Sequence, residues 1–112
     1  MLKILLPILA VVAVTGQTVA LARTMEQVAA AVGQVEGGFN RARFRCLAAG
    51  IPMPTFAQLH PDDDPTIGPD LKARYPDFFA FGEAKGVAQA DRILSGTTRD
   101  FREGCALFKT LK

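Results

Sequence analysis

Side chains that carry catalysis are scarce in this sequence of 112 residues. The chain holds one histidine, His60, and a single serine, Ser95. A serine hydrolase needs a base beside its nucleophile, and the sequence around Ser95 is not typical of such a site. A Cys-x-x-Cys-His haem-attachment motif, a glycine loop for phosphate and the ligand spacing of a zinc site are all missing. We therefore expect neither an enzyme nor a bound cofactor.

A strong excess of charge of one sign is also missing. The chain carries 13 basic and 11 acidic side chains, and Lys3 is the only charged residue among the first 22. The remainder of the chain is therefore close to neutral. Because proteins that bind nucleic acids normally show a clear basic excess, we expect no nucleic-acid partner.

Long apolar runs are missing everywhere except at the N-terminus. There Lys3 precedes an apolar run over residues 4–14, and Ala20-Leu21-Ala22 has the small-x-small pattern that signal peptidase cleaves. The alternative is an uncleaved membrane anchor, which would need roughly 20 predominantly apolar residues. We interpret residues 1–22 as a cleaved signal peptide. Residues 23–112 are then one domain, periplasmic or secreted, with no membrane insertion after cleavage.

Cysteine is limited to Cys46 and Cys105. Export would place both in an oxidising compartment, and two cysteines allow only one intramolecular pair. We predict a disulfide between them. Two separate thiols and an intermolecular bridge are the alternatives.

A first helix is predicted over residues 25–49. Thr24 and Gln27 have the spacing of a capping box, and apolar residues then recur every three or four positions. The residues predicted to face the core are Met25, Val28, Val32, Val35, Phe39, Ala42 and Cys46. Because glycine is a poor helix former, Gly33, Gly37 and Gly38 predict a bend near Gly37.

Prolines then interrupt the helical pattern. Residues 50–69 hold five of them, which exclude a long helix. We predict an ordered crossing segment here, with one turn over residues 55–59 capped by Thr55. A short helix is expected over residues 70–75, and Pro76 is suited to the first position of another.

The C-terminal region carries a second apolar stripe. Its members are Val87, Ala90, Leu94, Thr97, Phe101, Cys105 and Phe108. The phase continues through Ser95 and Gly96, which predicts one kinked helix or two nearly collinear helices, with Thr97 or Thr98 as a cap. Because Cys46 and Cys105 lie on the two stripes, we predict an all-α bundle of three to four helices. Its first and last helices are cross-linked by one disulfide.

The far side of the first helix is the candidate partner surface. Arg41, Phe44, Arg45 and Ala48 share a face there, and arginine and aromatic residues are enriched at the energetic centres of protein interfaces. The alternative is that the proline-rich segment or a later phenylalanine cluster covers Phe44.

That cluster consists of Phe78, Phe79 and Phe81. Three rings within four residues cannot all face inward from one helix, so at least one of them needs cover. We expect the cluster to belong to the core, with a binding patch as the alternative.

An acidic loop contains the weak metal candidates His60, Asp62 and Asp64, with Asp63 between the last two. Carboxylates on a constrained loop suit a hard divalent cation. However, the glycine position does not match a calcium-binding loop, and no glutamate closes it. The simpler interpretation is a solvated acidic turn.

Together these observations favour a small exported interaction protein: an adaptor, inhibitor or chaperone that acts through the surface around Phe44. Its partner would be another envelope protein or a second copy of the chain. The alternative is a periplasmic protein that binds a metal or a small ligand through His60 and the aspartates of its loop. In size, helix content, export and single disulfide the chain is similar to the small acid-activated periplasmic chaperones, with no motif in common.

Overall fold

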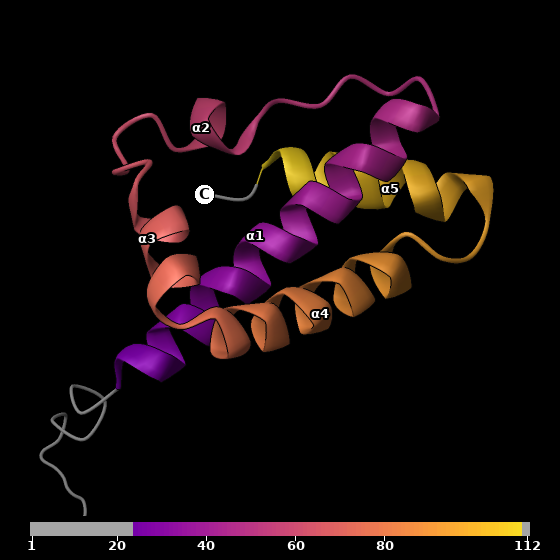
Figure 1. Cartoon of the computed structure of the whole chain (residues 1–112). Coiled ribbons are helices and arrows are strands. Elements are labelled where there is room, and N and C mark those ends of the chain that lie inside the picture. Colours follow the sequence, from indigo (N-terminus) through magenta and orange to yellow (C-terminus); the bar gives the residue numbers. More distant parts are fainter. Residues whose placement is uncertain (1–23, 111–112) are drawn as a thin grey trace, which may run out of the picture.

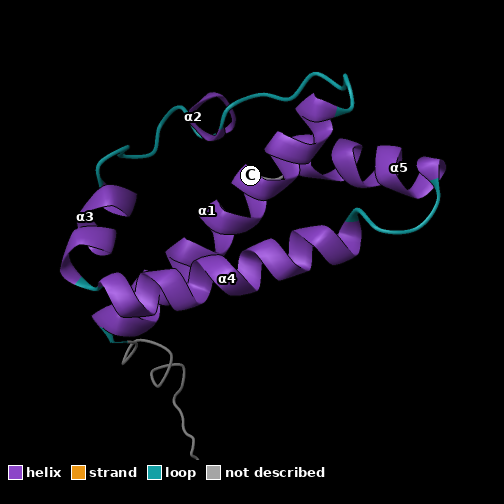
Figure 2. Ribbon diagram, turned by 45° about the vertical axis from the view of Figure 1, so that its right-hand side comes forward, coloured by secondary structure: helices purple, strands orange, loops and turns teal. Residues whose placement is uncertain are grey.

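The computed structural model describes residues 24–110, and within this range the chain is all-helical, as predicted. The helices are α1 (Met25–Ala48), α2 (Phe56–Leu59), α3 (Ile67–Arg74), α4 (Pro76–Ile93) and α5 (Thr98–Lys109) (Figures 1 and 2). They number five rather than three or four, because the crossing segment forms a one-turn helix and the C-terminal stripe divides into two helices. The interpreted signal peptide, residues 1–22, lies outside the described residues.

Threonine caps begin three of the helices. The hydroxyl of Thr24 accepts a hydrogen bond from the backbone N–H of Gln27, and the Gln27 side chain accepts one from the backbone N–H of Thr24. Thr55 and Thr97 make the same reciprocal pair with the residue three positions further on. Such boxes satisfy N–H groups that the start of a helix leaves without a partner. The predicted caps at Thr24 and Thr55 are confirmed, and Thr97 rather than Thr98 caps α5.

The chain runs back along α1 before it forms α4. Figure 1 shows the crossing segment returning from the C-terminal end of α1 toward its N-terminal end, where α3 leads into α4. α4 therefore runs parallel to α1, an arrangement that requires a long connection. Arg43 fastens this connection to α1, because its Nε donates a hydrogen bond of 3.1 Å to the carbonyl oxygen of Pro54. Pro76 is the first residue of α4, as predicted, whereas α3 begins at Ile67, earlier than expected.

Glycines allow α1 and α4 to pack with their backbones in contact. A Cβ atom added at Gly37 would lie 2.7 Å from the carbonyl oxygen of Glu83, and one added at Gly82 would overlap the carbonyl group of Ala30. The buried glycines of this contact are Gly33, Gly37 and Gly38 on α1 and Gly82 and Gly86 on α4. α1 continues as one helix through Gly37 (Figure 1). These glycines therefore serve the close packing of α1 against α4.

The face that α1 buries changes along its length. Phe39, Ala42 and Cys46 are buried, as predicted, whereas Met25 and Val35 are exposed. The prediction is therefore wrong for Met25 and Val35, while Val28 and Val32 are partly buried against the cluster around Phe79. In this half of α1, α4 packs mainly against the glycines. The apolar stripe is fully buried only in the C-terminal half of α1, where the crossing segment and α5 cover it.

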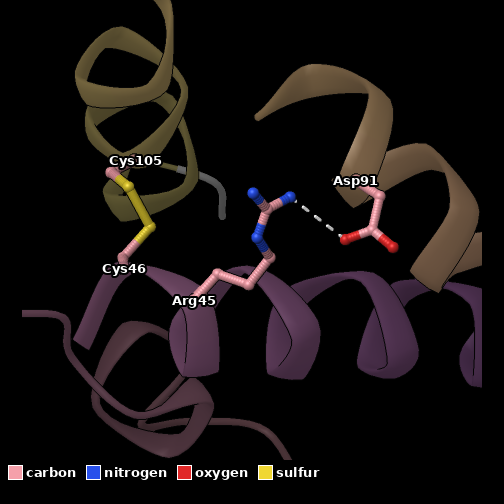
Figure 3. Close-up of a disulfide and its surroundings, with 4 residues drawn as sticks. All are labelled: Arg45, Cys46, Asp91 and Cys105. Atoms are coloured by element: carbon pink, nitrogen blue, oxygen red, sulfur yellow. Dashed lines mark hydrogen bonds and ion pairs between the residues drawn. A yellow bond between two sulfur atoms is a disulfide. The ribbon is translucent and has the colours of Figure 1, made fainter. Parts of the chain in front are cut away.

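Two apolar clusters hold the helices together. The larger joins residues of α1, the crossing segment, α4 and α5, among them Phe39, Cys46, Cys105 and Phe108. The smaller gathers around Phe79 of α4. The disulfide lies in the larger cluster, where Cys46 and Cys105 have their Cα atoms 6.0 Å apart (Figure 3). The predicted disulfide, and with it the cross-link between the first and last helices, is confirmed.

α5 turns back instead of continuing α4. The turn contains Gly96, whose φ of 101° is a conformation that glycine adopts readily, and both ribbon views show α5 running back toward α1 (Figures 1 and 2). The expectation of one kinked helix or two nearly collinear helices is therefore wrong. Leu94 and Phe108 still share one cluster, because the reversal folds the two halves of the stripe onto the same core. Over residues 24–110, no helix combines the length and apolarity that crossing a membrane requires.

Candidate functional site

Phe44 is the aromatic residue at the centre of the candidate partner surface. Its side chain is 67% exposed, so neither the crossing segment nor the phenylalanine cluster of α4 covers it. Ala48, one turn further along α1, is exposed as well. Leu47 is also exposed, and its spacing of three from Phe44 makes the two neighbours on the helix surface. Leu47 is not among the residues predicted for this surface, although its spacing from Phe44 indicates it. Phe44, Leu47 and Ala48 form the Phe44 patch.

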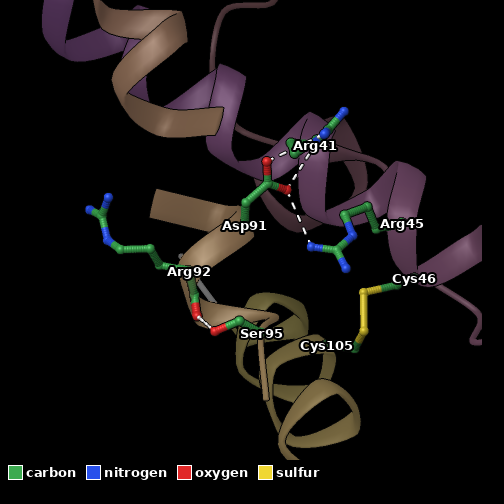
Figure 4. A network of polar contacts seen from close by, with 7 residues as sticks. All are labelled: Arg41, Arg45, Cys46, Asp91, Arg92, Ser95 and Cys105. Carbon is green, nitrogen blue, oxygen red and sulfur yellow. Dashed lines mark hydrogen bonds and ion pairs between the residues drawn. A yellow bond between two sulfur atoms is a disulfide. The ribbon is translucent and has the colours of Figure 1, made fainter. Parts of the chain in front are cut away.

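The two arginines of the predicted surface bind α4 instead of flanking the patch freely. The Nε of Arg41 lies 3.0 Å from Oδ1 of Asp91, and Nη1 of Arg45 lies 3.2 Å from the same oxygen (Figure 4). These contacts, chiefly the hydrogen bond from Arg41, hold the pKa of Asp91 below its ordinary value. Of the four residues predicted to share a surface, Arg41, Phe44 and Ala48 are exposed and Arg45 is half-buried. The two arginines also join α1 to α4.

Arg45 also connects this ion-pair network to the disulfide. Figure 3 shows its side chain directed toward α4, while the adjacent Cys46 reaches Cys105 of α5. The Arg45 guanidinium lies 5.5 Å from the centre of the Phe101 ring, which α5 contributes. α1, α4 and α5 therefore meet beside the Phe44 patch. The backbone that carries the patch is held by a covalent bond and by ion pairs.

The phenylalanine cluster divides between core and surface. Phe79 is 2% exposed, whereas Phe78 is half exposed and Phe81 is 62% exposed. Lys85 lies over the Phe81 ring, with Nζ 5.3 Å from its centre. The outer side of α4 therefore carries a second exposed apolar area, separate in sequence from the Phe44 patch.

The acidic loop is held by its own polar contacts. Oδ1 of Asp64 accepts hydrogen bonds from the backbone N–H of Thr66 at 2.9 Å and from its hydroxyl at 2.7 Å. Both bonds, the backbone one foremost, lower the pKa of Asp64. His60 stacks on Phe56 with ring centres 4.4 Å apart, and its Nδ1 lies 3.5 Å from Oδ2 of Asp63. These contacts give the loop a defined shape.

Metal ligands do not converge in the part of the chain that the structure describes. Within residues 24–110, no three His, Cys, Asp or Glu side chains are placed so that they could hold a metal ion together. The weak candidates His60, Asp62 and Asp64 are neighbours in sequence but do not surround a common point.

A groove of about 830 Å³ lies between α1 and the crossing segment. Its apolar lining includes Val32 and Val35 from α1, Phe56 from α2 and Ile67 from α3. Its ionisable lining residues are Glu36, His60, Asp62, Asp63 and Asp64. We refer to it as the acidic groove. Its volume lies in the range typical of small-molecule sites, so the loop that the sequence singled out forms part of a cavity wall.

Glu36 lines the acidic groove but is not among the residues predicted from the sequence. It lies one turn after Val32 on α1. An acidic residue within an apolar stripe is the sequence feature that indicates a functional position here. Burial raises the pKa of Glu36, Glu83 adds to the increase, and Lys72 opposes it. The Nζ of Lys72 lies 3.9 Å from Oε2 of Glu83. A half-buried carboxyl group therefore lines the acidic groove close to a second acidic side chain.

Ser95 has a structural role. It lies in the turn between α4 and α5, where its hydroxyl donates a hydrogen bond of 2.6 Å to the carbonyl oxygen of Arg92 (Figure 4). The same carbonyl oxygen also accepts a hydrogen bond of 3.2 Å from the backbone N–H of Ser95. Ser95 therefore caps the C-terminal end of α4, where carbonyls lack partners within the helix.

The geometry leaves three features without a structural explanation: the Phe44 patch, the exposed rings of Phe78 and Phe81, and the acidic groove. No protein-family model, curated protein or solved structure matches the chain.

Proposed function

We propose that this protein is a small exported interaction protein of the cell envelope that binds a partner protein through the Phe44 patch. The observation that carries the proposal is the exposure of Phe44. Burying a phenylalanine side chain stabilises a protein or a complex by roughly 2 kcal/mol. Because Phe44 is mostly exposed, folding of this chain does not gain most of that stabilisation. A partner that covers the Phe44 ring and Leu47 would gain this stabilisation on binding.

The rigidity of the surrounding backbone supports the same proposal. Association loses less entropy when the binding surface is already ordered. The disulfide at Cys46 and the ion pairs of Arg41 and Arg45 with Asp91 supply this order. We infer that the two arginines position the patch and that the apolar side chains make the contact.

Export is supported by the disulfide together with the N-terminal sequence. Disulfides persist in oxidising compartments, and residues 1–22 are typical of a cleaved signal. We expect protein recovered from the periplasm of expressing cells to begin at Arg23, which an intact-mass measurement checks. Recovery of the full-length chain in the membrane fraction would instead support the anchor alternative.

The test of the partner surface is Phe44→Ala. We expect its thermal midpoint to stay within about 3 °C of the parent, because substitutions at exposed positions usually change stability by less than about 0.5 kcal/mol. We also expect immobilised Phe44→Ala to lose the envelope proteins that the parent chain captures from extract, identified by mass spectrometry. Sedimentation velocity of the parent chain alone tests whether the partner is a second copy.

The matched control is Phe81→Ala on α4. It removes the same side chain from a site of similar exposure, 62% against 67%, so it should retain the captured proteins. Equal capture by Phe44→Ala and the parent would reject the proposal. Equal loss from both variants would indicate nonspecific adhesion of exposed aromatic rings.

A second candidate function is the binding of a small ligand by His60 and the neighbouring aspartates. The observation that favours it is the acidic groove, whose wall this loop forms. Binding of a metal ion has no such support, because the carboxylates of the loop do not converge. Calorimetric titration with calcium, zinc and nickel distinguishes a metal-binding loop from a groove for a small organic ligand. We expect no heat of binding from any of these ions.

A further inference from the structure

The acidic groove has a charge opposite to that of the chain as a whole. Four of the residues that line the groove are acidic, and none of the lining residues is a lysine or an arginine. Yet the whole chain holds more basic than acidic side chains, 13 against 11. The carboxylates are Glu36 on α1 and Asp62, Asp63 and Asp64 on the opposite wall. A groove of this composition attracts cations and repels anions.

The same groove also leaves apolar side chains open to solvent. Val35 is 56% exposed on α1, and Ile67 is exposed at the start of α3. Val32 and Phe56 line the groove between them. The cavity therefore offers an apolar surface and a carboxylate rim within one volume of about 830 Å³, which together suit a ligand with an apolar part and a positive charge.

We infer that the acidic groove binds a small organic cation that carries an aliphatic chain, such as a long-chain primary amine. This inference rests on the small-ligand function proposed for the loop. The chain would lie against Val32, Val35 and Ile67, and the ammonium group would face the aspartates. A small molecule fits better than a protein segment, because the cavity volume is that of a drug-sized ligand.

The hydrogen bonds of the loop support this assignment. Hydrogen bonds from Thr66 favour the charged carboxylate of Asp64 and lower its pKa. His60 contacts Asp63 and stacks on Phe56, and these two contacts hold the loop in place along the groove. The negative charge is therefore present in a defined position before any ligand arrives. Such preorganisation lowers the entropy lost on binding.

The direct test compares three ligands of equal chain length: decylamine, decanol and sodium decanoate. Each is titrated below its aggregation concentration into the ¹⁵N-labelled protein, and amide shifts are followed by NMR. We expect decylammonium to bind roughly tenfold more tightly than decanoate, because the carboxylates attract the one and repel the other. The shifts should be largest around Val32, Val35 and Ile67.

A pair of matched substitutions on α1 localises the site. Val35→Arg places a guanidinium group at the groove, whereas Leu47→Arg makes an equivalent change at another exposed apolar position of the same helix. We expect Val35→Arg to abolish decylammonium binding and Leu47→Arg to retain it. The variant Asp62→Asn, which keeps the contact between His60 and Asp63, should reduce the preference for the cation over decanol while leaving the thermal midpoint unchanged.

The outcomes separate the inference from the function on which it rests. Equal or tighter binding of decanoate or decanol would overturn the assignment of a cation while leaving a small-ligand groove. Failure of all three ligands would overturn both. Shifts centred on Phe78 and Phe81 instead of the groove, or retained binding by Val35→Arg, would show that the site is elsewhere.

Discussion

The substitution Gly82→Ala tests the close packing of α1 and α4. In an exposed helix this change would stabilise the protein by about 1 kcal/mol, because alanine is the better helix former. At Gly82 the added Cβ atom would overlap the carbonyl oxygen of Ala30 and lie 2.7 Å from its carbonyl carbon. Both are backbone atoms of α1, so no side-chain rotation relieves the contact and the helices must move apart.

The expected result is a net loss of stability. Overpacking of a well-packed site costs about 1–3 kcal/mol, and a clash with backbone belongs at the upper end of that range. After the gain in helix propensity is subtracted, we expect Gly82→Ala to lower the free energy of unfolding by about 2 kcal/mol. Urea denaturation followed by circular dichroism at the helical band measures this as a lower midpoint.

The matched control is Ala84→Gly, which makes the reverse change at an exposed position of α4. It should cost about 1 kcal/mol and thereby measures the propensity contribution within this helix. If Gly82→Ala instead stabilised the protein by the amount that Ala84→Gly costs, α1 and α4 could not approach as closely as described. The account of the glycine face would then be refuted.

Two further predictions concern the disulfide and Glu36. Replacing Cys46 and Cys105 by alanine opens a loop of 59 residues. This should lower the free energy of unfolding by roughly 4 kcal/mol. Urea denaturation measures the change, and equal midpoints for the variant and the parent would contradict the prediction. The pKa of Glu36 is raised in the folded protein, so its contribution to stability is present below the ordinary glutamate pKa and is lost as the pH rises through the folded value. Glu36→Gln should therefore gain stability relative to the parent as the pH rises from about 4 to 7, and a difference that stays constant across this range would refute the assignment.

Much of the local structure follows from short-range patterns. Thr24 with Gln27, and Thr55 with the residue three positions on, begin helices as their spacing predicts. Pro76 begins α4 because its fixed φ and missing N–H suit the first position of a helix. The pairing of Cys46 with Cys105 follows from the count of two cysteines together with the interpretation of an exported chain. The function classes and the signal peptide remain predictions, because no described residue tests them.

The candidate sites were only partly predictable. The position of Phe44 opposite the apolar stripe follows from the spacing, but its exposure depends on where the crossing segment and α4 lie. The binding of Arg41 and Arg45 to Asp91 likewise depends on α4 lying parallel to α1. The loop around His60 is visible as a run of aspartates. The acidic groove is not, since Glu36 and Val35 join that loop only after the chain has returned along α1.

The sequence by itself determined where the helices begin, that the fold is all-helical and which cysteines pair, because these features depend on neighbouring residues or on a simple count. The tertiary structure decided which face of α1 is buried, how α5 turns and where a groove opens. The physical reason lies in the glycines. A residue without a side chain adds nothing to an apolar periodicity, yet it permits the backbone contact between α1 and α4. That contact leaves Val35 exposed on one side of α1, and it brings Asp91 within reach of Arg41 and Arg45.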